Sequence, residues 1–412
     1  MLELRDYQDQ ISSQAADLLS EHKIAYLAME CRTGKTLTAL AAALKYGAKS
    51  VLVISKLKAL PSIRADYDLM RPAFTMDVVN YESAQKFIGN KYDLVILDEA
   101  HSLGAFPKPS KRTKTVRDLC KNTPIIYLSG TPTPESFSQL YHQFWVSSYS
   151  PFKIFTTFYK WAKVYVETTQ KMVGGHTIND YSRANKDKID KVAKKYFIDY
   201  SQEEAGFDAK IVEHVLSVKM DDWTANAINR LKRDKILSWD DVNILGDTPA
   251  KLMSKIHQLS SGSVIDESGT HIITDYSKAR FIRDYFRGKK IAIFYVYQTE
   301  AELLKKAFPN WTDIPEEFQN NDDLVFIGQV RSAREGVRLD TANALIFFNL
   351  EYSYLSYEQG KNRLSSKERS NPALIYFIVS DCGIEQDILD AVHGKQDYTF
   401  AYFKTKQYGR IF

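Results

Sequence analysis

The chain is poor in cysteine, has no long apolar run and carries no large excess of charge. Its three cysteines, Cys31, Cys120 and Cys382, lie far apart without metal-ligand spacing, which favours a reduced, cytoplasmic compartment. No run approaches the roughly 20 apolar residues of a membrane span, and Met1–Arg5 lacks the layout of a secretion signal. A net charge of +4 over 412 residues does not by itself indicate a nucleic-acid partner. The length allows two domains, and we expect no membrane partner.

The most informative feature that is present is an apolar run ending in two carboxylates. Tyr92–Leu97 is followed at once by Asp98, Glu99, Ala100 and His101. Such a run predicts a strand buried on both faces of a parallel sheet, and open α/β sheets bind ligands at the carboxyl ends of their strands. One carboxylate can hold a magnesium ion while its neighbour orients a water. A solvated acidic turn is the alternative that this run alone leaves open.

A second feature, Gly34-Lys35-Thr36, has the composition of a phosphate-binding loop. The glycine lets the backbone approach phosphates, the lysine reaches the β/γ oxygens, and the threonine hydroxyl can ligate magnesium. The helix-forming run Leu37–Lys45 follows, so amides and a positive dipole end would face the phosphates. Met29 stands where such loops carry their first glycine. The short string is common by chance, but its place before a helix and upstream of Asp98–His101 favours the functional interpretation.

The chain contains two blocks in which helix-like and buried-strand patterns alternate. In residues 1–145 we expect a helix over Tyr7–Glu21 and strands at Val51–Ser55, Asp77–Asn80, Leu94–Asp98 and Ile125–Ser129. In the second block we expect strands at Lys290–Tyr297, Leu324–Ile327, Ala344–Leu350 and Ala373–Val379. The predicted fold is therefore α/β, with two doubly wound parallel-sheet lobes.

We expect domain boundaries at 1–150 for the first lobe, 151–260 for a mostly helical insertion, 261–384 for the second lobe and 385–412 for a tail. The insertion is rich in aromatic residues and lysine, which favours a packed helical core over base stacking. The tail, with aromatic residues such as Tyr402 and Phe403, is predicted to pack back on the lobes.

Two clusters of basic residues could contact phosphates. The first comprises Lys108, Lys111, Arg112, Lys114 and Arg117. The second comprises Lys186, Lys188, Lys191, Lys194 and Lys195. A solvated face is the alternative for both; the two interpretations are balanced for the first cluster, and the solvated face is preferred for the second.

The order of the motifs resembles that of superfamily 2 helicases and translocases of the DEAD/DEAH-box type. The matching segments are Leu4–Gln8, Gly34–Thr36, Asp98–His101, Ser129–Pro134, Gly328–Leu339 and Gln359–Arg363. The glutamine of the last segment and Ala342-Asn343 favour the Swi/Snf-like branch. In its compactness the chain is similar to small helicases encoded by bacteriophages, which would act in the host cytoplasm.

This resemblance implies two RecA-like lobes that bind ATP and Mg²⁺. Nucleotide binding is implied for Arg5, Gln8, Arg32, Thr33, Gly34, Lys35, Thr36 and Gly336, with adenine recognised by Gln8 near Arg5. Magnesium would be held by Thr36 and Asp98. Catalysis is implied for Lys35, Asp98, Glu99, Gln359 and Arg363. Coupling of the γ-phosphate to nucleic acid is implied for His101, Ser129 and Thr131. Contact with nucleic acid is implied for Ser55, Lys56, Asn80, Tyr81, Ser332 and Arg338.

The chain departs from the family pattern in its last two motifs. Many relatives carry a second arginine three residues after the one at Arg363, but Ser366 stands there and the next arginine is Arg369. Either Arg363 alone acts as arginine finger, or Arg369 does, or hydrolysis is weak. Arg338 replaces the usual Asp or Asn and could contact nucleic-acid phosphates.

The function that we expect is that of an ATP-dependent DNA helicase or translocase, acting as a monomer on single- or double-stranded DNA without sequence preference. An RNA-directed ATPase is one alternative. A nucleotide-gated nucleic-acid-binding module with weak hydrolysis is another.

Overall fold

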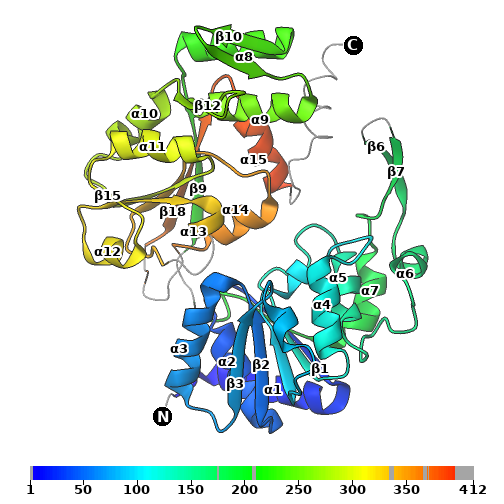
Figure 1. Ribbon diagram of the computed structural model, residues 1–412. Helices are drawn as coiled ribbons and strands as arrows, with labels where there is room; N and C mark the ends of the chain where they lie inside the picture. Colours follow the sequence, from blue (N-terminus) through cyan, green and yellow to red (C-terminus); the bar gives the residue numbers. More distant parts are fainter. Residues whose placement is uncertain are drawn as a thin grey trace. The chain divides into compact units, whose positions relative to one another are not determined.

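The computed structural model describes residues 3–173, 176–206, 210–333, 338–364, 369 and 371–394. The chain divides into two compact units, Met1–Gly206 and Phe207–Phe412, and each is described by itself (Figure 1). Among the described residues, no helix combines the length and the apolar character needed to cross a membrane.

The first unit is built on a six-stranded sheet in which every pair of neighbours is parallel. Its strands, in spatial order, are β3 (Thr75–Asn80), β2 (Ser50–Ser55), β4 (Leu94–Leu97), β5 (Ile125–Leu128), β1 (Ile24–Met29) and β8 (Phe197–Tyr200). The four strands that the sequence predicts for this block are all present. β1 was not predicted, because its apolar run follows the first helix without a turn residue between them.

Alternate residues of these strands enter different cores, as the period of two in a strand requires. Tyr26 and Tyr127 pack with the helices α4 to α7, whereas Leu27 and Leu128 pack with α1 to α3. Helices therefore cover both faces of the sheet (Figure 1). They are α1 (Asp6–His22), α2 (Lys35–Tyr46) and α3 (Leu60–Met70) on one face, and α4 (Lys111–Cys120), α5 (Gln139–Trp145), α6 (Phe158–Tyr165) and α7 (Lys186–Ala193) on the other.

The second unit repeats this plan. Its all-parallel sheet has the order β15 (Trp311–Thr312), β16 (Val325–Gln329), β14 (Ile291–Tyr295), β17 (Ala344–Phe347), β18 (Ala373–Ser380) and β9 (Ile211–Val218). Around it lie α8 (Asp222–Asp234), α9 (Pro249–Ser260), α10 (Ser277–Tyr285), α11 (Gln298–Ala307), α12 (Pro315–Asn320), α13 (Val330–Ala333), α14 (Tyr354–Lys361) and α15 (Glu385–His393). The four predicted strands of this block are present, so the structure has the two doubly wound sheets that the sequence predicts.

The region 151–260 differs from the predicted helical insertion. Besides helices it contains the hairpins β6–β7 (Thr169–Val173 and His176–Asp180) and β10–β11 (Ile236–Trp239 and Val242–Leu245). It also supplies β8 and β9, which are edge strands of the two sheets. Edge strands are half exposed and mix polar with apolar residues, so they lack the apolar run that marks a central strand. The predicted aromatic tail after Gly394 lies outside the described residues.

A short hairpin, β12 (Ser263–Ile265) and β13 (His271–Ile273), follows α9, and two glycines in left-handed conformation lie directly before its first strand and in its turn. At Gly262 (φ +85) a Cβ would lie 2.1 Å from the carbonyl oxygen of Asp275, whereas at Gly269 (φ +87) a Cβ would meet nothing within 4 Å. The two positions share a backbone conformation and differ in the space around them.

We therefore predict that Gly262→Ala destabilises the chain more than Gly269→Ala. The left-handed strain of about 1–2 kcal/mol is common to both, while overpacking adds about 1–3 kcal/mol at Gly262 alone. Urea unfolding of the two variants beside the parent measures the difference in free energy of unfolding. Equal losses would contradict the prediction.

Candidate functional site

The candidate site lies at the carboxyl edge of the first sheet. Because the sheet is parallel, the loops after β1, β5 and β4 leave from the same edge, with β5 between the other two strands. The loop Glu30–Gly34 follows β1, Ser129 follows β5, and Asp98 follows β4. The fold thus brings together the phosphate-loop sequence and the carboxylates, which are more than 60 residues apart in the chain.

The loop after β1 turns sharply into α2. Arg32 and Gly34 both have positive φ values, 64° and 79°, and α2 begins at Lys35. The Nζ atom of Lys35 donates to the carbonyl oxygen of Glu30 over 3.0 Å, and the hydroxyl of Thr33 donates to the same oxygen over 2.8 Å. The loop therefore places a cation and the first amides of a helix side by side, which is the chemistry of a phosphate site.

The opening of α1 packs directly on this loop. Gln8 Nε2 donates to the carbonyl oxygen of Gly34 over 3.4 Å, and a Cβ at Gly34 would lie 2.3 Å from that nitrogen. The backbone N–H of Arg5 donates to Gln8 Oε1 over 3.1 Å. Arg5 and Gln8 are thus next to the loop as the motif order implies, and adenine recognition by them stays a prediction.

Sequence reasoning missed two further residues that hold the loop. The hydroxyl of Tyr7 donates to the carbonyl oxygen of Thr33 over 3.0 Å, and Gln202 Nε2 donates to that of Cys31 over 2.8 Å. Tyr7 lies inside a motif and could have been singled out from its position. Gln202 follows the edge strand β8, and no local signal in the sequence marks it.

Asp98 is partly buried and is held by two side chains. The hydroxyl of Ser55 donates to Asp98 Oδ2 over 2.6 Å, and the hydroxyl of Tyr81 donates to the carbonyl oxygen of Asp98 over 2.6 Å. Desolvation, aided by the neighbouring charge of Glu99, raises the pKa of Asp98 to about 6, while Ser55 and Lys35 oppose the rise. Because burial disfavours the charged form of this carboxylate, a cation or a phosphate-bound metal beside it would stabilise the carboxylate.

Glu99 belongs to a set of close polar contacts centred on His101. Its backbone is left-handed (φ 51°), and its carboxylate lies 3.2 Å from Nδ1 of His101. The same nitrogen lies 3.0 Å from Oγ of Ser129, which accepts a hydrogen bond from the backbone N–H of Thr131 over 3.1 Å. The three residues predicted to couple the two ligands therefore form one network with Glu99.

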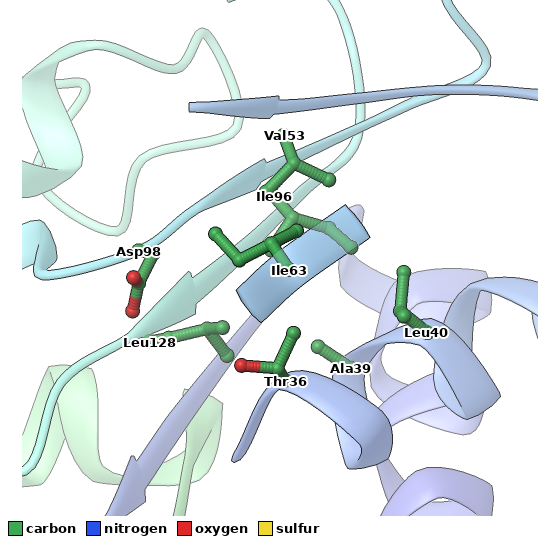
Figure 2. A pocket seen from close by; sticks show the side chains of 8 residues that line it. All are labelled: Thr36, Ala39, Leu40, Val53, Ile63, Ile96, Asp98 and Leu128. Atoms are coloured by element: carbon green, nitrogen blue, oxygen red, sulfur yellow. The ribbon is translucent and has the colours of Figure 1, made fainter. Parts of the chain in front are cut away.

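A small pocket lies between Thr36, at the start of α2, and Asp98, after β4. Figure 2 shows the hydroxyl of Thr36 and the carboxylate of Asp98 at one end of it, on either side of Leu128. The rest of the lining is apolar and comprises Ala39, Leu40, Val53, Ile63 and Ile96. Its volume of about 10 Å³ admits roughly one water.

The donors at this pocket fit Mg²⁺, which takes one or two protein oxygens and completes its shell with phosphates and water. Thr36 and Asp98 offer a hydroxyl and a carboxylate from two elements of the same edge. Among the described residues no cluster of three or more His, Cys, Asp or Glu side chains could hold a metal ion. A magnesium ion here would therefore depend on the phosphates that arrive with it.

The four residues of the first unit that were predicted to contact nucleic acid fall into two groups. Ser55 and Tyr81 are buried (0% and 3% exposed) and point at Asp98, where Ser55 supports the carboxylate and Tyr81 the backbone carbonyl. Lys56 and Asn80 are half exposed at the same edge, where contact with nucleic acid stays a prediction. In the first basic cluster, Arg112 lies over the ring of Tyr81, and it pairs with Glu82.

In the second unit, Gln359 lies on α14 and Arg363 follows the end of that helix. Both are mostly buried (4% and 8% exposed), and Nε of Arg363 donates to the carbonyl oxygen of Gln359 over 3.0 Å. Within the part of the chain that the structure describes, Oε1 of Gln359 is buried without a hydrogen-bond partner. Arg363 and Gln359 are thus brought together, while Gly336 and Ser366 lie outside the described residues.

Arg369 is committed to the backbone. Its guanidinium donates to the carbonyl oxygens of Asp340, Ala342 and Asn371 over 2.9, 2.9 and 3.1 Å. Burial lowers its pKa below the usual value for arginine. Five donors in a rigid fork suit such a clamp, so Arg369 ties its own segment to the loop before β17.

Arg338 and Ser332 are the two residues of the second unit that were predicted to contact nucleic acid. Arg338 pairs with Asp340, its Nε donating to Oδ2 over 2.8 Å. Ser332 lies half-buried on α13. A phosphate contact by Arg338 stays a prediction and would compete with Asp340.

The chain matches a known protein family over most of its length. The model of a family described as SNF2-related domain matches residues 19–274, which is more than half of the chain. The matched region includes the phosphate loop, Asp98–His101 and Ser129. Among curated proteins, none matches the chain significantly.

We predict that Asp98→Asn stabilises the chain at about pH 8 but not at about pH 4. The pKa of Asp98 in the folded chain, about 6, is above the ordinary 3.8. Stability that comes from the protonated carboxyl is therefore present below pH 3.8 and lost as the pH rises through about 6. Removal of the charge should raise the free energy of unfolding at the higher pH by about 1–3 kcal/mol, measured by urea denaturation.

Asp93→Asn is the matched control, and its effect has the opposite sign. Asp93 precedes β4 and accepts the backbone N–H groups of Lys49 and Ser50 over 2.8 and 3.0 Å, which lowers its pKa. Its substitution should destabilise the chain at about pH 8. The account of Asp98 is wrong if the two variants shift stability in the same direction.

Proposed function

The chain belongs to the SNF2-related domain family, of the Swi/Snf branch of superfamily 2 helicase-like proteins, and from this premise we propose that it is an ATP-dependent DNA translocase or helicase. The observation that carries the proposal is the edge of the first sheet. There the Lys35–Thr36 loop, the Asp98–Glu99 carboxylates and the His101–Ser129 network lie together. A turn that only ended a strand would need none of these contacts.

In the proposed reaction, the triphosphate of ATP enters the loop between β1 and α2. Lys35 leaves the carbonyl of Glu30 for the β/γ oxygens, and the first amides of α2, with Arg32, Thr33 and Gly34, surround the phosphates. Thr36 and Asp98 would hold Mg²⁺, which when bound supplies positive charge to the phosphoryl oxygens. Arg5 and Gln8, next to the loop, contact the base.

Glu99 is the proposed base that orients and deprotonates the attacking water. Its carboxylate contacts His101, and His101 contacts Ser129. A movement of Glu99 would therefore be passed to the loop Ser129–Thr131 through these contacts. This network gives the γ-phosphate a route to the loops that would grip nucleic acid. Because each ligand would bias the same arrangement, ATP and DNA should tighten each other's binding.

For the second unit we propose that Gln359, Arg363 and Gly336 complete the catalytic state. Arg363 is the better candidate for the arginine finger, because it lies in the last motif against Gln359, whereas Arg369 lies beyond that motif and holds three backbone carbonyls. Lys56, Asn80, Ser332 and Arg338 are proposed to contact the nucleic-acid backbone, which needs only cations, hydroxyls and amides and therefore carries no sequence information.

A nucleotide-gated nucleic-acid-binding module with little hydrolysis is the second candidate. The clamp made by Arg369 favours it, since this chain then has one arginine fewer for the phosphates than the family pattern supplies. The two candidates differ in turnover. An ATPase assay with duplex DNA, single-stranded DNA and RNA, run beside strand displacement and binding, separates them and also tests the RNA-directed alternative.

Lys35→Ala and Glu99→Gln should both abolish DNA-stimulated ATPase activity, with losses in kcat of about 10²–10⁴-fold for the base. They should differ in nucleotide binding. Lys35→Ala removes the cation that would bind the phosphates and should weaken nucleotide binding. Glu99→Gln should leave nucleotide binding intact. Titration with a fluorescent ATP analogue measures both.

Lys45→Ala and Glu82→Gln are the matched controls. Lys45 is on the same helix as Lys35 and pairs with Asp9, and Glu82 is an exposed carboxylate after β3 that pairs with Arg112. Both should keep turnover near that of the parent. Parent protein that shows no turnover with any of the three nucleic acids would refute the enzyme proposal.

Arg363→Ala and Arg369→Ala should fail in different ways. Arg363→Ala should lower kcat by about 10³-fold or more, as loss of an arginine finger does. Arg369→Ala should lower the unfolding midpoint, because the partly buried carbonyls of Asp340 and Ala342 lose charge-assisted hydrogen bonds of about 1.5–3 kcal/mol each. Kinetics and thermal unfolding on both variants decide the assignment, and an Arg363→Ala enzyme with full turnover would overturn it.

A further inference from the structure

A second polar groove lies in the first unit, at the foot of the β6–β7 hairpin and apart from the residues assigned to ATP. Its walls are the end of α6 and the segment that enters α7, and the hairpin extends away from both helices (Figure 1). The side chains that give it its chemistry are Lys163, Glu167, Arg183, Asn185 and Lys188. The family motifs include none of them.

Backbone pairing fixes the two walls of this groove. Val166 and Ala184 form an antiparallel bridge, the N–H of Glu167 donates to the carbonyl of Arg183 over 2.9 Å, and the N–H of Asn185 donates to that of Tyr165 over 2.7 Å. The walls are thus tied by contacts between segments nearly 20 residues apart in the chain. The groove is part of the folded unit and not a gap between loops.

The charge in the groove is predominantly positive. Its lining contains three cationic side chains, Lys163, Arg183 and Lys188, and one carboxylate, Glu167. All four are exposed, so their charges are available to a ligand. The groove also meets the start of α7, where Asn185 caps the helix by accepting the N–H of Lys188 over 2.9 Å, and the positive end of the helix dipole adds to the field.

Size and surroundings indicate the kind of anion that fits. The cavity volume of about 540 Å³ is far larger than a single phosphate needs and lies in the range of extended ligands. The aromatic residue in its lining, Tyr165, is only 9% exposed and offers no face to a bound nucleotide base. Tyr159, one helical turn before Lys163 on α6, is 44% exposed and lies where a base next to the groove could stack.

We propose that this groove binds the phosphodiester backbone of single-stranded nucleic acid, with Lys163, Arg183 and Lys188 on the phosphates and Tyr159 beside a base. This contact rests on the proposed function and adds to it a second contact with nucleic acid, which begins at Tyr159, beyond the last motif of the first unit at Ser129–Pro134. It also gives Lys188 of the second basic cluster a role other than that of a solvated face. The single acidic side chain, Glu167, opposes the same ligand.

The test is the affinity of the full chain for a fluorescent single-stranded DNA over a range of salt. The triple variant Lys163→Gln, Arg183→Gln, Lys188→Gln should bind about 10- to 100-fold more weakly at 0.1 M salt. Its log–log salt slope should be smaller by about two units, since each phosphate contact on a single strand contributes about 0.7. Glu167→Gln should bind more tightly than the parent, a gain that damage to the fold would not produce.

The matched control is Lys49→Gln, Lys91→Gln, Lys121→Gln, which removes three exposed lysines that precede β2, β4 and β5 and do not line the groove. It should bind DNA as the parent does.

If the groove variant has the same DNA affinity as this control while the parent binds DNA and hydrolyses ATP, the groove inference is wrong and the proposed function stands. If the parent neither binds DNA nor hydrolyses ATP, both fail. Binding of a polyglutamate peptide that the groove variant loses, with DNA binding unchanged, would identify an acidic protein as the ligand and overturn the inference.

Discussion

Parallel pairing of β1, β5 and β4 is the constraint on which the candidate site depends. In a parallel sheet every strand ends at the same edge, so three loops distant in the chain must meet there. The insertion of β5 between the other two decides what lies between phosphate loop and carboxylates. Ser129, at the end of β5, is therefore next to His101, and the His101–Glu99 contact becomes part of a network and not an isolated pair.

The same edge of the sheet holds groups in unfavourable states, which a purely structural edge would not need. Asp98 is desolvated enough to raise its pKa, and Glu99 adopts a left-handed backbone that a non-glycine residue rarely takes. Buried hydroxyls from Ser55 and Tyr81 hold Asp98 in place. Burial keeps the pKa of the Tyr81 hydroxyl well above its ordinary value, so that it remains a donor. Strained and desolvated groups persist where the surrounding fold supports them, and here they converge on the place where a cation and phosphates would relieve them.

The second unit has the same sheet plan but divides its arginines differently from the family pattern. Arg369 donates hydrogen bonds to backbone carbonyls of the loop before β17, while Arg363 lies against Gln359 at the end of α14. From the sequence both were candidates for the arginine finger, since Arg363 ends the last motif and Arg369 is the next arginine after it. Their backbone surroundings make them different, since a guanidinium that already satisfies several carbonyls loses those bonds if it reaches elsewhere.

The sequence by itself determined the α/β class, eight strands of the two sheets and the order of the motifs, because buried parallel strands have continuous apolar runs and the loops after them have a characteristic composition. It did not show the central strand β1, whose apolar run follows the first helix directly. It did not show the edge strands β8 and β9, whose half-exposed surfaces mix polar and apolar residues. Nor could it show that Gln202 holds the phosphate loop, that Ser55 and Tyr81 turn inward to Asp98, or that Arg183 and Lys163 share a groove. These facts depend on contacts between residues far apart in the chain. Only the tertiary structure decides them, because the direction of a side chain follows from the neighbours that the fold supplies and not from its place in a motif.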